Sequence, residues 1–348
     1  MRKTAFFNFH DLITLKISGL SSWVFPDLNT KFSFFSVDSL ESPDISVEIG
    51  PFKPRLVGTA AMDQHYFAKP GYLYFTEEDK GLRWEADIEW KKNGQVSIRY
   101  FAPLSNRLKL PWTFFPEMIL HLYILIPMIE EMLIRKGCFL LHAGAAAKDG
   151  KVVLWIGRGG TYKTTFVLRS LKEGYSLLGD DFVLVKGSRV FSFPTSPVWL
   201  EFTHKYLKDE RMNFADQCRL AWYLMTHKKS ALPFIESAVI ERAEILLACD
   251  GDLSGNGPLA RTQNEKIEMI VTNQLLERSA YVSYRYRIGE FLEVYDYICP
   301  GIRGGAFEKG VRDLAHLSFS HLPMAVRGIR LDIPKPIKDN NATMKVFL

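Results

Sequence analysis

The feature that most constrains this chain is a glycine-rich segment between an apolar strand and a helix. The segment Gly157-Arg-Gly-Gly-Thr-Tyr-Lys-Thr-Thr follows Lys151-Val-Val-Leu-Trp-Ile, a run typical of a buried strand. Strand, loop and helix in this order are the context of the phosphate-binding pattern G-x-x-x-x-G-K-[ST]. Such a loop points backbone N–H groups at an anion, and the helix N-terminus adds a positive dipole. We therefore predict a phosphate site formed by Gly157, Arg158, Gly159, Gly160, Thr161, Tyr162, Lys163, Thr164 and Thr165.

Two side chains of this loop have specific expected roles, and a third departs from the pattern. Lys163 is expected to reach the β- and γ-phosphates, and Thr164 to hold Mg²⁺ through its hydroxyl. Tyr162 stands where the last glycine of the pattern is expected, and a bulky residue is unfavourable at positive φ. The alternative interpretation is a glycine turn followed by an ordinary helix start.

Two adjacent carboxylates follow one helix later, at the start of a predicted strand. Asp180 and Asp181 occur in Gly179-Asp-Asp-Phe-Val-Leu-Val. Like charges this close repel when buried, and a metal ion or a lysine across the site would relieve the repulsion. One aspartate is then expected to be a general base and the other a partner of Mg²⁺-nucleotide. The alternative is a turn with two solvated acids, since aspartate is a common turn residue.

Regular segments elsewhere predict two regions joined by a helix. In the first region, residues 1–110, five short runs are rich in β-branched and aromatic residues and are separated by turn formers, among them Asn93-Gly94, a hairpin signal. These runs are Phe32–Val37, Ile45–Ile49, Tyr72–Phe75, Trp84–Trp90 and Val96–Tyr100. A helix is expected within residues 111–137, from about Pro116 to Lys136, with Gly137 as its terminator.

The second region, residues 138–333, alternates strands and helices, and residues 334–348 read as a loose tail. Beyond the loop we expect a short apolar run at Phe139–His142, a helix at Thr164–Glu173, and another helix at Lys266–Ser279. Further strands are expected at Tyr175–Leu178, Phe182–Val185, Ala243–Cys249 and Ala325–Ile333. The prediction is an α/β fold, with a P-loop core of mixed sheet and flanking helices after a β-rich N-terminal domain.

The order of these elements resembles a known family. The stretch Leu141-His-Ala-Gly-Ala-Ala-Ala, then strand, loop and helix, then Gly-Tyr-Ser-Leu-Leu-Gly-Asp-Asp-Phe-Val-Leu-Val is similar to the core of the HPr kinase/phosphorylases. The resemblance covers about His142 to Glu201. It implies Mg²⁺-dependent transfer of the γ-phosphoryl group of ATP to a serine hydroxyl.

The resemblance also implies roles for individual residues. Asp180 would take the hydroxyl proton, and Asp181 would lie near the metal with Thr164. His142 matches a histidine close to the phosphates, although a lone histidine before a strand is otherwise more often a packed residue. Glu201 lies where the family places a second metal carboxylate.

The chain departs from the family at two places. Tyr162 replaces the last glycine of the loop, and Phe-Thr-His-Lys-Tyr-Leu follows Glu201 where a glycine-containing segment is typical. We therefore do not carry over HPr as substrate, the phosphorylase reaction or the hexamer. A second glycine-rich turn, Pro300-Gly-Ile-Arg-Gly-Gly, carries Arg303, which is either part of a flexible loop or a cation reaching transferred phosphate.

Composition limits the partners. The 348 residues carry 44 basic and 39 acidic side chains, and the net charge of +5 does not argue for nucleic acid. Cys138, Cys218, Cys249 and Cys299 lack metal or redox spacing, so we expect small buried residues in a reducing compartment.

The apolar segments of the chain do not predict export or a membrane span. The apolar start of the chain is interrupted by His10, Asp11 and Lys16, which argues against export. Met118–Ile129 is shorter than the roughly 20 residues of a membrane span and is expected to be a core helix, with membrane contact as the alternative. We expect a cytoplasmic protein, with the homo-oligomer left open.

These observations favour three functions in order. The first is an ATP-dependent kinase acting on a hydroxyl of a protein, peptide or small molecule. The second is a nucleotide-binding regulatory or scaffold protein without transfer activity, which Tyr162 would favour. The third is a carboxykinase-like enzyme, for which the sequence lacks further metal ligands. The acceptor, the choice among ATP, GTP and pyrophosphate, and the oligomeric state stay open.

Overall fold

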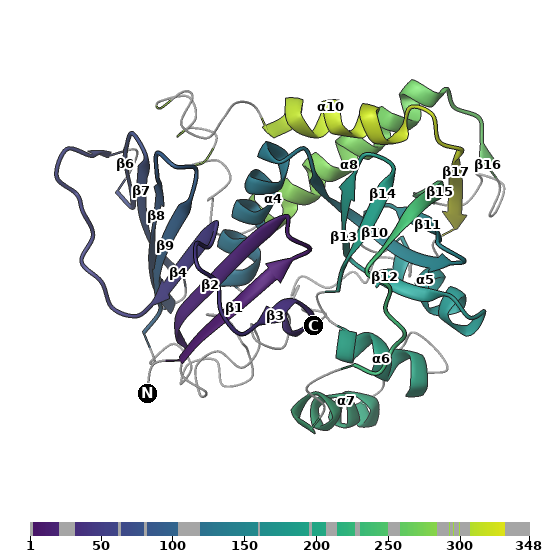
Figure 1. Cartoon of the computed structure of the whole chain (residues 1–348), viewed down its shortest axis with the longest axis horizontal. Helices are drawn as coiled ribbons and strands as arrows, with labels where there is room; N and C mark the ends of the chain where they lie inside the picture. Colours follow the sequence, from purple (N-terminus) through teal and green to yellow (C-terminus); the bar gives the residue numbers. More distant parts are fainter. Residues whose placement is uncertain are drawn as a thin grey trace, which may run out of the picture.

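A computed structural model describes residues 3–20, 32–61, 64–79, 82–103, 119–158, 161–194, 197–206, 214–226, 230–249, 258–283, 292, 295, 299 and 307–330. It contains two mixed sheets with helices packed between and around them (Figure 1). Gly159 and Gly160, the start of the predicted linking helix, the turn with Arg303 and the C-terminal tail lie outside the described residues. The fold is therefore of the mixed α/β class that the segment pattern predicts.

Among the described residues, the first sheet has nine strands, in the order β3-β1-β2-β4-β9-β8-β7-β6-β5. Its strands are β1 (Lys3–Phe9), β2 (Ile13–Leu20), β3 (Ser36–Val37), β4 (Ile45–Ile49), β5 (Ala60–Ala61), β6 (Tyr66–Lys69), β7 (Tyr72–Asp79), β8 (Leu82–Trp90) and β9 (Val96–Phe101). The predicted turn at Asn93-Gly94 is confirmed, since β8 and β9 pair antiparallel across it and Gly94 has φ +84°. The strict alternation of buried and partly exposed residues in β9 explains why this hairpin was readable in the sequence.

The strand predicted at Phe32–Val37 is wrong. The chain forms a short 3₁₀ turn, Ser33–Phe35, before the two-residue strand β3. The turn lets both Phe32 and Phe35 reach the core, where each contacts the ring of Phe9 at centroid distances of 5.4 and 4.6 Å. An extended strand would place residues three apart on opposite faces, so burial of both rings favours the turn.

The second sheet follows the order β11-β10-β13-β14-β15-β17-β16, with β12 paired to β10. Its strands are β10 (Phe139–Lys148), β11 (Lys151–Ile156), β12 (Ser176–Gly179), β13 (Phe182–Lys186), β14 (Arg189–Phe193), β15 (Ser237–Cys249), β16 (Pro258–Leu259) and β17 (Met324–Arg330). Because β11 also pairs parallel with β15, the five strands β11, β10, β13, β14 and β15 close a circuit of hydrogen bonds. The short run predicted at Phe139–His142 is thus the first part of a ten-residue strand.

Helices complete the fold. They are the π-helix η2 (Ile119–Leu125), α4 (Ile126–Arg135), α5 (Lys163–Lys172), α6 (Pro197–Tyr206), α7 (Phe214–Thr226), α8 (Gln263–Ser283) and α10 (Phe307–Phe319). In Figure 1, α4 lies between the two sheets, while α6 and α7 lie together on the side of the second sheet that carries α5. Gly137 ends the linking helix with φ +72°, as predicted.

One hydrophobic core joins the first sheet, α4 and one face of the second sheet. Phe9 of β1 stacks on Phe193 of β14 at 5.5 Å, and Leu140 and Phe182 belong to the same buried cluster. Ile124 to Ile126, with Met128 and Ile129, are buried there, so the apolar segment is a core helix as expected. The expectation of buried cysteines is confirmed for Cys138 and Cys299 and is wrong for Cys218, which is exposed on α7.

Candidate functional site

The predicted phosphate loop connects β11 to α5. Gly157 follows the last residue of β11, and Lys163 begins the helix. A Cβ at Gly157 would lie 2.5 Å from the Thr161 hydroxyl and 2.9 Å from the Leu246 carbonyl oxygen, so only glycine allows the turn to close here. Thr161 strengthens the turn by donating its hydroxyl proton to the Arg158 carbonyl at 2.7 Å.

Small residues of β10 allow α5 to approach the sheet. A Cβ at Gly144 would lie 2.7 Å from the Val167 side chain and 3.3 Å from the Lys163 carbonyl oxygen. Ala146 lies on the same face of β10 and belongs to one buried cluster with Val167 and Leu171 of α5, whereas Ala145 and Ala147 lie in the cluster on the other face of the sheet. Small residues on the α5 side of β10 therefore let the first turn of α5, with Lys163, lie close to the sheet.

Lys163 points into the loop. Its side chain is buried, and Nζ donates to the carbonyl oxygens of Gly157 at 2.7 Å and Arg158 at 3.0 Å. Carbonyl dipoles solvate an ammonium group less well than a phosphate would. The amine is thus held at the centre of the loop, where an incoming anion would compete favourably with these carbonyls.

Tyr162 adopts the backbone conformation of the glycine it replaces. It is the N-cap of α5 with φ +59° and ψ 24°, in the left-handed region. This conformation costs a non-glycine residue about 1–2 kcal/mol. Tyr162 is 38% exposed, and its backbone connects the loop to the first turn of α5.

The two aspartates lie in the tight turn between β12 and β13. A Cβ at Gly179 would lie 2.2 Å from the Phe182 carbonyl oxygen, so the turn requires glycine before the acids. Asp180 is buried, with 7% exposure, whereas the Asp181 side chain is 42% exposed. Within the part of the chain that the structure describes, no side-chain donor bonds the Asp180 carboxylate.

His142 accompanies Asp181. Its Nε2 lies 2.8 Å from Asp181 Oδ1, and the backbone N–H of Ala143 donates to the Asp181 carbonyl at 3.1 Å. The histidine that the resemblance assigned to the site is thus in direct contact with one of the two predicted aspartates. This contact brings β10 and the turn after β12 to one corner of the second sheet.

Two buried residues that the sequence did not indicate form a hydrogen-bond chain that starts at the backbone of His142. The Gln274 side-chain carbonyl accepts the backbone N–H of His142 at 3.0 Å, and its amide donates to Glu130 at 3.0 Å. Gln274 lies on α8 and Glu130 on α4, so neither is near the loop in sequence. Polar residues inside helices usually face solvent, and no local pattern marks these two as buried.

The two aspartates are expected to differ in protonation. Burial, followed by the neighbouring charge of Asp181, raises the pKa of Asp180 to about 7. Burial also raises the pKa of Asp181, but the hydrogen bond and charge of His142 and the charge of Lys163 outweigh it and leave that pKa lowered. The charge of Lys163 lowers the pKa of both acids, so the loop amine lies on their side of the site. One acid is poised to exchange a proton near neutral pH, and the other stays a carboxylate.

The remaining metal candidates are Thr164 and Glu201. Thr164 is the second residue of α5 and is partly exposed. Glu201 is buried on α6, where one carboxylate oxygen contacts Lys205 and the other accepts the Ala231 N–H at 2.6 Å. Across the described residues, no group of three or more His, Cys, Asp or Glu is arranged to hold a metal ion. The assignment of Glu201 therefore stays a prediction, while Thr164 and Asp181 offer hydroxyl and carboxylate oxygens of the kind that Mg²⁺ binds.

Comparison with known proteins adds no relative. No protein-family model matches the chain, and a search of curated proteins found no match. Among the helices of the described ranges, none is long and apolar enough to cross a membrane. The function is therefore inferred from the residues of the site.

Proposed function

We propose that this protein is a nucleotide-binding kinase with an HPr-kinase-like core, which transfers the γ-phosphoryl group of ATP to a hydroxyl acceptor. The observation that carries the proposal is the pairing of a buried loop lysine with two aspartates of opposite pKa shift. Lys163 lies in the predicted phosphate loop, Asp180 has a pKa of about 7, and Asp181 is held ionised by His142. A positive charge, a base poised near neutral pH and a permanent carboxylate are the groups that phosphoryl transfer uses.

The residues divide the work as follows. Lys163 turns from the Gly157 and Arg158 carbonyls to the phosphates and offsets their charge. Asp180 takes the proton of the acceptor hydroxyl while the hydroxyl oxygen forms a bond to the γ-phosphorus. At the same time, the bond from that phosphorus to the leaving nucleoside diphosphate breaks. His142 keeps Asp181 oriented and ionised. Thr164 and Asp181 are the residues that would hold Mg²⁺, which supplies charge neutralisation for the phosphates.

The second candidate is a nucleotide-binding regulatory protein without transfer activity. Its support was Tyr162, expected to distort the loop. The left-handed conformation of Tyr162 weakens that support, because the backbone keeps the shape that glycine would give it. The raised pKa of Asp180 also favours chemistry, since burial of a carboxyl that accepts no side-chain hydrogen bond from the described residues has a stability cost that a purely structural turn would avoid.

Calorimetric titration with MgATP tests the first step. We expect wild-type protein to bind, and Lys163→Met to bind at least tenfold more weakly, since a charge-assisted contact to phosphate is lost. Lys172→Met is the matched control, because Lys172 is an exposed lysine at the opposite end of α5 and should bind normally. Folded wild-type protein that binds neither ATP, GTP nor pyrophosphate would contradict the proposal.

Transfer is tested separately with γ-labelled ATP and candidate protein, peptide and small-molecule acceptors. Asp180→Asn should bind MgATP and fail to label an acceptor that the wild type labels. Binding by the wild type with equal labelling by Asp180→Asn would remove Asp180 from the mechanism. Binding without labelling of any acceptor would favour the regulatory candidate.

A further inference from the structure

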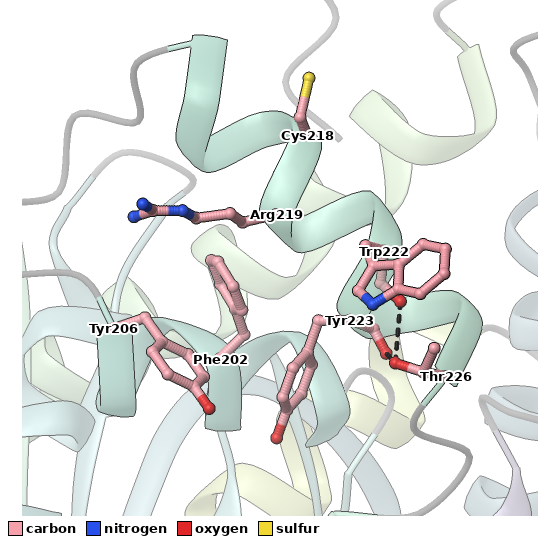
Figure 2. A pocket seen from close by; sticks show the side chains of 7 residues that line it. All are labelled: Phe202, Tyr206, Cys218, Arg219, Trp222, Tyr223 and Thr226. Carbon is pink, nitrogen blue, oxygen red and sulfur yellow. Dashed lines mark hydrogen bonds between the residues drawn. The ribbon is translucent and has the colours of Figure 1, made fainter.

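A hollow of about 520 Å³ lies between α6 and α7, where none of the predicted phosphate-site residues lines it. Figure 2 shows Phe202 and Tyr206 projecting from α6, with the other lining side chains on α7. The lining residues are Phe202, Tyr206, Cys218, Arg219, Trp222, Tyr223 and Thr226. Ligand pockets commonly have volumes of about 300–1,000 Å³ and mostly apolar walls, so both size and lining suit a small molecule.

Three rings form the inner wall of the hollow. Phe202, Tyr206 and Tyr223 contact one another with centroid distances of 5.2, 5.5 and 5.7 Å. Phe202 and Tyr223 are buried, so they belong to the packing between the two helices. The inner wall is thus a rigid aromatic surface, against which a flat ring can stack.

The outer edge of the hollow is aromatic and exposed. Trp222 is 67% exposed and Tyr206 is 58% exposed. Both rings line the hollow, on opposite sides of it in Figure 2. Apolar groups gathered at one hollow mark a binding surface, whereas single exposed rings scattered over a surface are common. A planar ligand that enters the hollow would cover both.

Arg219 gives the hollow its charge. Among the lining residues, all of which lie in the described part of the chain, it is the one with a formal charge at neutral pH. Its side chain is 75% exposed, and its ion-pair contact is with Asp216 at 3.9 Å, at the outer limit for such a pair. The nearby carboxylate of Glu201 is buried and already contacts Lys205 and the Ala231 N–H, so it does not neutralise Arg219.

We propose that the hollow between α6 and α7 binds a planar apolar molecule that carries one negative charge, of the aryl carboxylate class. Its ring would stack on Phe202, Tyr206 and Trp222, and its carboxylate would accept hydrogen bonds from the Arg219 guanidinium, whose geometry matches a carboxylate. A cationic aromatic ligand, which aromatic walls alone would favour, is opposed by the charge of Arg219.

Two probes that differ in charge test the proposal on the full chain. Calorimetric titration with 2-naphthoate and with neutral 2-naphthalenemethanol should show about fivefold tighter binding of the anion. Arg219→Gln should remove this preference and leave the neutral probe unchanged. Trp222→Ala should weaken both probes by about tenfold, because the ring loses a stacking partner and covered area.

Matched controls come from exposed side chains elsewhere. Arg261→Gln removes an arginine that is 49% exposed and also has a long acid contact, 3.6 Å from Glu265, and it should leave the preference intact. Leu317→Ala removes another exposed apolar side chain, on α10, and should leave both affinities intact. Arg219 and Trp222 are themselves exposed, so their variants should fold.

Three results would overturn the proposal. They are no binding of either probe by the wild type, tighter binding of 2-naphthylmethylammonium than of 2-naphthoate, and anion preference that survives Arg219→Gln. The second result would assign the hollow to cations, and the third would place the anion site elsewhere on the chain.

Discussion

Asp87 in the first sheet and Asp180 in the second are both buried carboxylates, but the two regions treat the charge differently. Asp87 is 2% exposed and accepts hydrogen bonds from the Tyr72 hydroxyl at 2.8 Å and from Arg99 Nε at 3.0 Å, with a second bond from the Arg99 guanidinium. Asp180 is 7% exposed and faces a second carboxylate instead.

This difference distinguishes an acid with a structural role, Asp87, from an acid that can exchange a proton near neutral pH, Asp180. Hydrogen bonds and an ion pair offset the desolvation of Asp87, so its region needs nothing more. At Asp180, burial is the largest influence on the carboxyl group, and it raises the pKa so that the group can be protonated instead of charged. Among the residues that the structure describes, no side-chain donor bonds Asp180, so this acid is available to a ligand or a proton, and we expect chemistry at the second sheet rather than at the first.

The largest expected effect comes from breaking the structural acid. Asp87→Asn should lower the free energy of unfolding by about 3 kcal/mol, since removal of one partner leaves the other poorly paired. Chemical denaturation at pH 7 measures it. Glu89→Gln is the control in the same strand, because Glu89 pairs with Arg55 at 35% and 51% exposure and should contribute less than about 1 kcal/mol. Equal losses in the two variants would mean that burial does not distinguish these pairs.

Asp180→Asn should raise the free energy of unfolding, whereas Asp87→Asn lowers it. The carboxyl pKa is raised from 3.8 to about 7, so the folded state binds the extra proton between these values. Stability from this group is therefore fully present below pH 4 and is lost as the pH rises through 7. At pH 8 the variant should be more stable than the wild type by about 2 kcal/mol, about half of what the full shift would give, because relaxation of the protein and entry of water reduce the cost of a buried charge. At pH 4 the two should be equal.

Denaturation of metal-free protein at pH 4 and pH 8 measures this difference. The same substitution should abolish phosphoryl transfer, so stability and activity would change in opposite directions. A variant that is less stable than the wild type at pH 8 would show that Asp180 is a structural acid like Asp87, and the contrast between the two regions would fail.

Much of the candidate site could be predicted because the interactions that form it are local in the chain. A strand, a glycine turn and a helix start follow one another within the chain, so Lys163 and the region's fold were readable. The resemblance placed His142 near the phosphates, but its contact with Asp181, 39 residues away in the chain, was not predicted. Gln274 is 132 residues from His142 and lies inside a helix, where no periodicity distinguishes a buried amide from an exposed one.

The hairpin of β1 and β2 could not be predicted from the sequence, for a different reason. β1 and β2 are joined by a turn in which His10 and Asp11 have φ +55° and +56°, without glycine or proline. Asn8 stabilises this turn by exchanging hydrogen bonds with Asp11. In the sequence the polar residues of the turn appear only as interruptions of an apolar run, so the hairpin carries no conventional signal.

A third prediction concerns the acid beside Asp180. His142→Gln should raise the pKa of Asp181, because the hydrogen bond and charge of His142 keep that pKa low. The lowered pKa contributes stability above the ordinary range of aspartate, which is lost as the pH falls through the folded value. At pH 7 we expect about 1.5 kcal/mol less stability, reduced from the value for a buried pair because Asp181 is 42% exposed.

Carboxyl NMR titration of Asp181 and denaturation at pH 7 measure these two effects. His316→Gln is the matched control, since His316 lies 3.7 Å from Glu268 at 42% exposure and should change stability little. An unchanged Asp181 pKa in His142→Gln would show that Lys163 alone keeps this acid ionised, and His142 would then be a packing residue.

The smallest expected effect tests whether the left-handed conformation of Tyr162 stores strain in the loop. Tyr162→Gly should raise the free energy of unfolding by about 1 kcal/mol, because glycine adopts φ +59° freely but loses more entropy on folding. Tyr162→Ala is the control that removes the ring and keeps the Cβ, so it should not gain stability. Denaturation at pH 7 distinguishes the two variants.

If Tyr162→Ala stabilises as much as Tyr162→Gly, the ring and not the backbone is the source of strain. If neither variant is more stable than the wild type, the loop holds its left-handed residue without strain. If Tyr162→Gly also keeps the wild-type affinity for MgATP, the tyrosine substitutes for glycine in shape, and the loop is as able to cradle phosphate as the pattern it departs from.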